Sequence, residues 1–228
     1  MYTPRFFTAL LLPIVLAWVG AAHANLVQLV TVDTSAISGS AGYAIAFSFQ
    51  DGSGLVPADN NNTATLSNFN FGGGSAAGLP VLVGGASGSL GAGVVLADSD
   101  FSSLFAQGFT PGSSLSFILD LTTNLDASLI PDFFGFSILS SGVPLPTLDD
   151  LGGDNLLYVN IDSASPVASA FATAAGSPVA LNSPVLSAPP PVPPGPGQLP
   201  EPGSLPLLLA GLAGLFGVVR RQSQVAAG

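Results

Sequence analysis

The chain has 228 residues, thirteen of them acidic and only three basic, so its formal net charge is −10 at pH 7. It has no cysteine, which excludes a disulfide framework and thiolate chemistry. Arginine occurs only at positions 5, 220 and 221 and histidine only at 23, so the segment 25–199 carries twelve aspartates and no cation. This composition argues against serine catalysis, phosphoryl transfer, zinc binding and nucleic-acid binding, because each of them relies on histidine, lysine, arginine or cysteine.

The first residues have the three regions of a secretory signal peptide. Met1–Arg5 is short and basic, Phe6–Gly20 is apolar, and Ala22 and Ala24 form an A-x-A cleavage site. We therefore expect residues 1–24 to direct export and to be cleaved off. The alternative is an uncleaved N-terminal anchor.

In the next region, residues 25–162, large and small residues alternate in short segments that are separated by glycine-rich turns. No segment has apolar residues at the spacing of an amphipathic helix. In Gly42–Gln50, for example, large side chains alternate with small ones, as in a strand with one buried face. Eight such segments predict an all-β domain, an antiparallel β-sandwich of jelly-roll-like form. A β-solenoid is the alternative, but no repeat of fixed period is present. The expected strands are Leu26–Asp33, Gly42–Gln50, Thr63–Phe71, Leu79–Val83, Gly93–Ala97, Ser114–Thr122, Phe133–Ser140 and Asn155–Asp162.

Three acidic loops between these strands are candidates for calcium binding, because Asp, Asn and Gly loops offer carboxylate and carbonyl oxygens at short spacing. Two of them are Asp51–Gly54 with Asp59–Asn62, and Asp98 with Asp100. None matches the EF-hand pattern, and turns prefer the same residues for conformational reasons alone. The best single candidate is the third loop, with Asp149, Asp150, Asp154 and Asn155 as ligands.

The segment 163–199 is rich in alanine, serine and proline, and we expect it to be a linker. Six of the eight residues in Pro189–Pro196 are proline, which favours a semi-rigid polyproline II spacer. Such a spacer would hold the sandwich away from a membrane or matrix. A disordered tether without a binding role is the simpler interpretation.

The last part of the chain, residues 200–228, combines a proline motif, an apolar helix and a basic end. Fifteen apolar residues, Leu205–Val219, span about 22 Å as a helix, which is short of a roughly 30 Å hydrocarbon core. The segment would be held in a membrane transiently, with the arginines after it on the cytoplasmic side. The residues that carry the pattern are Pro200, Glu201, Pro202, Gly203, Arg220 and Arg221.

This tripartite end resembles the PEP-CTERM sorting signal of exopolysaccharide-producing Gram-negative bacteria. The resemblance implies that a membrane enzyme of the exosortase type processes the chain at this signal. A Gram-positive sortase signal is the nearest rival, but Pro202 stands where that motif has threonine. A buried C-terminal helix of a soluble domain is a further alternative, and the lack of a polar face counts against it.

Several segments between residues 25 and 162 also resemble a recurrent ectodomain family of PEP-CTERM proteins. That resemblance implies a surface or matrix protein and supplies no catalytic residues. The matching segments include Thr34–Ala36, Tyr43–Gln50, Ala64–Phe69, Gly84–Gly88, Asp98–Phe101, Gln107–Phe109, Ser114–Phe117 and Phe136–Ile138.

Together these features predict an exported, acidic, non-enzymatic protein of the cell surface or the extracellular polysaccharide matrix. Its expected partners are the exosortase-type enzyme, extracellular polysaccharide and, before processing, the inner membrane through its C-terminal helix. The alternative function is a calcium-dependent carbohydrate-binding module. A third class, an aspartate-based glycosidase, would need two carboxyls about 5–9.5 Å apart in a cleft.

Overall fold

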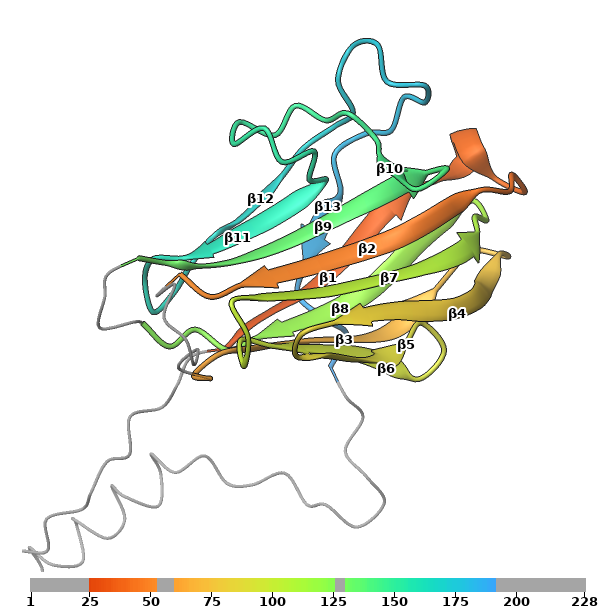
Figure 1. Ribbon diagram of the computed structural model, residues 1–228. Coiled ribbons are helices and arrows are strands. Elements are labelled where there is room, and N and C mark those ends of the chain that lie inside the picture. The colour runs from red at the N-terminus through yellow and green to blue at the C-terminus, as the bar shows by residue number, and fades with distance from the viewer. Residues whose placement is uncertain (1–24, 53–59, 126–129, 192–228) are drawn as a thin grey trace, which may run out of the picture. The chain divides into compact units, whose positions relative to one another are not determined.

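The computed structural model describes residues 25–52, 60–125 and 130–191, and these form a sandwich of two antiparallel β-sheets (Figure 1). The all-β prediction is therefore confirmed. Within the described ranges the helical structure is a single 3₁₀ turn, Ser35–Ile37, and none of it is long and apolar enough to cross a membrane. The expected signal peptide and C-terminal helix lie outside the described residues.

The first sheet has six strands in the order β13–β1–β8–β3–β6–β5, and the second is ordered β12–β11–β9–β2–β7–β4 with β10 paired to β9. Every pairing is antiparallel. The first sheet contains β13 (Val185–Ser187), β1 (Leu26–Asp33), β8 (Ser114–Leu121), β3 (Thr63–Asn70), β6 (Gly93–Ala97) and β5 (Ala86–Ser89). The second contains β12 (Ala168–Ala170), β11 (Leu157–Ile161), β9 (Asp132–Ser140), β2 (Tyr43–Gln50), β7 (Ser102–Thr110), β4 (Ser75–Val83) and β10 (Val143–Pro144).

The core lies between the sheets and is built from the alternate residues of each strand. Phe47 of β2 lies at its centre, and its ring centroid is 5.9 Å from that of Phe105, 5.3 Å from Phe117 and 5.4 Å from Phe136. These four phenylalanines come from four strands and both sheets, and all are fully buried. Each such side chain stabilises the fold by about 1.5–3 kcal/mol relative to exposure, so this cluster is a main source of sheet-to-sheet cohesion.

All eight expected strands overlap strands of the structure, but β7 was not expected from the sequence. Its inward-facing positions include two polar residues, Ser103 and Gln107, which hide the alternation. Both are satisfied by backbone groups. The Ser103 hydroxyl donates to the Ala97 carbonyl (2.6 Å) and accepts from the Gly85 N–H (2.8 Å).

Part of the region expected to be a linker is structured. Residues 163–189 belong to the sandwich: β12 pairs with β11, β13 pairs with β1, and Leu181 is buried in the core. The alanines and serines of β12 and β13 lie on edge strands, where backbone pairing rather than side-chain burial fixes the chain. Each of these strands is only three residues long, which is too short for an alternating pattern to reveal it.

Candidate functional site: a polar layer at one end of the sandwich

Four buried polar residues close one end of the core: Asp51, Asn62, Asp98 and Asp132, here called the polar end layer. Each lies two residues along its chain from a core residue, and period-two alternation therefore turns it toward the interior. The core residues concerned are Phe49, Ala64, Leu96 and Phe134, in the same order.

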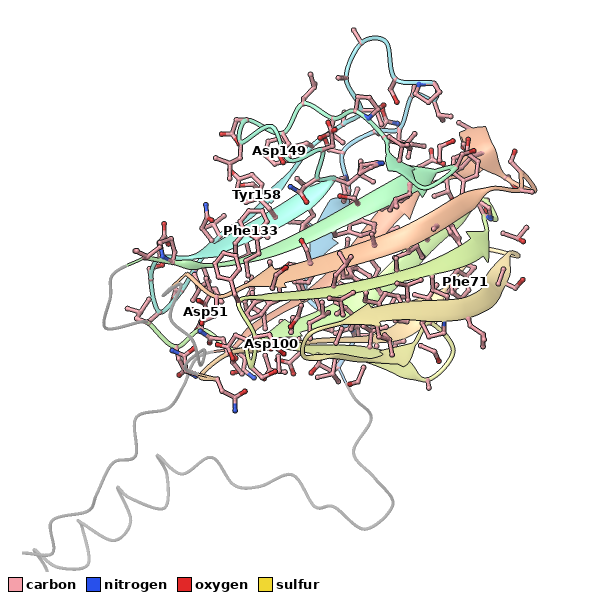
Figure 2. All side chains as sticks on the ribbon, in the orientation of Figure 1. Asp51, Phe71, Asp100, Phe133, Asp149 and Tyr158 are labelled. Atoms are coloured by element: carbon pink, nitrogen blue, oxygen red, sulfur yellow. The ribbon has the colours of Figure 1, made fainter. Side chains whose placement is uncertain are left out.

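Strand pairing brings these four positions together. Gln50 pairs with Phe133, which places Asp51 and Asp132 side by side at the end of the second sheet. Thr63 pairs with Ala97, which places Asn62 beside Asp98 at the end of the first. No member of the layer is more than 2% exposed. Figure 2 shows Asp51 at this end of the molecule, near Asp100 of the neighbouring loop.

Asn62 is the hub of the layer, and all four of its side-chain hydrogen-bonding positions are used. Its Nδ2 donates to the Asn124 carbonyl and to Asp132 Oδ2, both at 2.8 Å. Its Oδ1 accepts from the Asn124 N–H (2.8 Å) and the Thr122 hydroxyl (3.1 Å). The other oxygen of Asp132 accepts from the Gly52 N–H at 2.8 Å. Asn62 and Asp132 together therefore connect the two sheets.

Asp98 is only half satisfied. Its Oδ2 accepts from the backbone N–H groups of Asn62 (2.8 Å) and Asn61 (3.1 Å), whereas its Oδ1 is buried without a hydrogen-bond partner. Burial raises the pKa of Asp98, the two N–H groups lower it, and the nearby charge of Asp51 raises it further, so the pKa lies above its ordinary value. Two buried carboxylates thus interact electrostatically in a domain without a basic side chain.

The Asp149–Asn155 loop, the best calcium candidate from sequence, is held by hydrogen-bond donors. Asp149 Oδ1 accepts from Leu151 N–H (2.8 Å), and Oδ2 accepts from the N–H groups of Gly153 and Asn155 (both 3.2 Å) and from Asn155 Nδ2 (2.7 Å). Burial opposes ionisation of Asp149, but these N–H groups together outweigh it and hold its pKa below the ordinary value.

The other two aspartates of that loop accept hydrogen bonds from different donors than Asp149 does. Asp150 accepts from the Tyr158 hydroxyl (2.8 Å), and Asp154 accepts from the Thr147 N–H (3.2 Å). Within the described ranges no three Asp, Glu, His or Cys side chains gather as a ready metal site. Calcium binding by Asp149, Asp150, Asp154 and Asn155 stays a prediction.

Aromatic rings line part of the outer face of the second sheet, where Figure 2 shows Phe133 and Tyr158 beside each other. The Tyr158 ring lies between two others, 5.6 Å from Phe133 and 5.3 Å from Phe171 by ring centroids. Tyr158 is 8% exposed, because these neighbours and the Asp149 loop cover it. The hydrogen bond to Asp150, together with burial, raises the pKa of Tyr158.

The residues of the two expected sorting signals lie outside the described ranges, both the cleavage-site alanines and the motif from Pro200 to Arg221. The sequence places Asp51 and Asp98 in separate loops and does not single out Asp132. Strand alternation could have revealed all three, because each carboxylate lies two residues from an inward-facing apolar residue of a strand. No protein-family model, curated protein or solved structure matches the chain.

Proposed function

We propose that this is an exported, acidic, non-enzymatic protein of the cell surface or extracellular polysaccharide matrix, processed at its C-terminal sorting signal. The observation that carries the proposal is the order Pro200–Glu201–Pro202, apolar segment, Arg220–Arg221 in the sequence. Proline favours an extended backbone before it, which an exosortase-type enzyme needs for access, and an apolar run of this length is too short for a permanent membrane anchor.

The buried carboxylates of the described residues support a structural rather than a catalytic role. Asp132 accepts from a glycine N–H and an asparagine amide, and Asp149 accepts from four N–H donors. A catalytic acid or base must reach a substrate proton, typically at 2.6–3.2 Å, and these oxygens instead fix loops. The domain thus serves as a stable, strongly anionic body that contacts matrix polysaccharide.

We also infer that the sandwich is jelly-roll-like. The order β1–β8–β3–β6 in one sheet and β2–β7–β4 in the other supports this, because most connections pass from one sheet to the opposite one, as in paired Greek keys. Strands β9, β11 and β12 then extend the second sheet beyond β2.

The alternative, a calcium-dependent carbohydrate-binding module, usually needs an exposed aromatic platform for stacking on sugar rings. Among the described tyrosines, Tyr158 is covered by two phenylalanine rings, and no tryptophan follows Trp18 in the sequence. Because the Tyr158 ring is covered, a structural role is favoured over carbohydrate binding.

Replacing Pro200-Glu201-Pro202 by three alanines tests the proposal. We expect export to continue and an unprocessed form to accumulate in the inner membrane, because the helix and the arginines are unchanged. The localisation and mass of the variant are compared with those of a control, Pro191→Ala/Pro193→Ala/Pro194→Ala, which alters only the spacer. Normal surface delivery and normal mass of the motif variant would rule the proposal out.

A further inference from the structure

The polar end layer concentrates negative charge in a segment of the chain that has no basic residue. Asp98 is fully buried and Asp51 is 1% exposed. The Asp51 N–H donates to the carbonyl of Phe101 (3.1 Å), three residues after Asp98, so the two segments lie side by side, and the charge of Asp51 acts on Asp98. No lysine, arginine or histidine occurs anywhere from residue 25 to residue 199. No side chain of the domain can therefore neutralise the pair.

Asp98 Oδ1 is the atom that most needs a partner. Its sister oxygen Oδ2 is saturated by two backbone N–H groups, and these fix the carboxylate so that Oδ1 cannot rotate to share them. Oδ1 itself is buried and accepts no hydrogen bond. A buried ionised oxygen without a donor destabilises a fold strongly, and a second carboxylate nearby increases the penalty.

We propose that the polar end layer binds one calcium ion, with Asp98 Oδ1 and the Asp51 carboxylate as its charged ligands. The layer offers only oxygen donors, which suits a hard cation and excludes metals that require histidine or cysteine. Only two of the three carboxylates of the layer serve as ligands, so carbonyl, amide or water oxygens complete the six to eight ligands that calcium takes. Magnesium fits less well, because it demands near-octahedral geometry and loses water reluctantly.

Asp132 is a positioning residue in this proposal, not a ligand. One of its oxygens accepts from Gly52 and the other from Asn62, so both point to donors. Through these bonds it holds the start of the loop after Asp51 and the asparagine next to Asp98.

The test is thermal unfolding of the full-length protein in calcium, magnesium and sodium chloride at matched ionic strength. We expect calcium to raise Tm by roughly 3–5 °C for each tenfold increase above its Kd, and magnesium to raise it less. Asp98→Asn should abolish the calcium response. The exposed neighbour Asp100 supplies the matched control, because Asp100→Asn removes the same charge from the same loop and should keep the response.

In a chelator, which removes calcium, Asp98→Asn should stabilise the protein. The asparagine oxygen can still accept from Asn61 and Asn62, while its amide can donate toward Asp51. Without calcium we therefore expect the variant to melt above the wild type, and with calcium below it. Superimposable wild-type curves in the three salts, or a full calcium response in Asp98→Asn, would overturn the proposal.

Direct binding keeps the test decisive if Asp98→Asn does not fold. Calorimetric titration with calcium should give one ion per chain for the wild type and for Asp100→Asn. Asp51→Asn should weaken that binding at least tenfold. If Asp149→Asn abolishes binding and Asp51→Asn does not, the ion sits in the other loop and the proposal is wrong.

Discussion

Aspartates in this protein differ sharply in their surroundings, although the sequence gives all of them the same chemistry. Asp33 is exposed, and its bonds from the Ser35 hydroxyl (2.6 Å) and N–H (3.0 Å) lower its pKa. Asp149 is buried and surrounded by N–H groups, whereas Asp98 is buried with one oxygen bare. Whether a buried carboxylate stabilises the fold is decided by the donors around it, not by its depth.

Asp149→Asn should destabilise the protein by about 1–3 kcal/mol at pH 7. The asparagine NH₂ group would then face the N–H groups that now donate to the Asp149 carboxylate, and those hydrogen bonds would be lost. The pKa of Asp149 is lower in the folded than in the unfolded state, so its contribution is complete above the unfolded value and is lost as the pH falls through the folded one. The difference between variant and wild type should therefore shrink below about pH 4. Urea unfolding at several pH values measures it, with exposed Asp162→Asn as control. A difference that stays constant down to pH 2 would contradict this role.

At the scale of single elements, β7 shows how polar side chains become part of a strand core. Gln107 reaches between the sheets, where its Nε2 donates to the Gly78 carbonyl (2.9 Å) and its Oε1 accepts from the Leu90 N–H (2.8 Å). The register between β4 and β7 shifts between Ala77 and Val81, and Gly78 adopts a φ of +68° there. Gln107 thus satisfies a carbonyl that the bulge removes from the ladder.

Gln107→Leu should therefore destabilise the protein by about 2–4 kcal/mol, since it leaves one N–H and one carbonyl without these bonds while preserving side-chain volume. Chemical unfolding at pH 7 measures the change. Gln50→Leu, on an exposed position at the end of β2, is the matched control and should lie near the wild type. Equal effects of the two substitutions would show that Gln107 is not needed at the bulge.

The sequence predicted the elements whose inward faces are uniformly apolar. β2 and β8 were found because large residues alternate strictly with small or polar ones. β7 was not, because Ser103 and Gln107 take inward positions and their partners come from distant turns. The polar end layer was only partly visible for the same reason: Asp51 and Asp98 were assigned to separate loops, and the pairing that joins them is tertiary.

For the whole molecule, the chemistry of the ends determines the function we propose. The segment 25–199 is anionic and has no basic residue, and the ends of the chain carry the signals expected for export and sorting. The phenylalanine core and the edge strands of the sandwich all lie within residues 25–189. Processing at the C-terminus is therefore the central claim.

Cleavage of the native surface protein at aspartate residues, followed by mass spectrometry, tests that claim most directly. Asp162 is the last aspartate of the chain, so one fragment begins there and contains the mature C-terminus. We expect a fragment that ends before Leu205, because processing at the proline motif removes the apolar helix and both arginines. A fragment from surface material that continues through Arg220 would contradict the account.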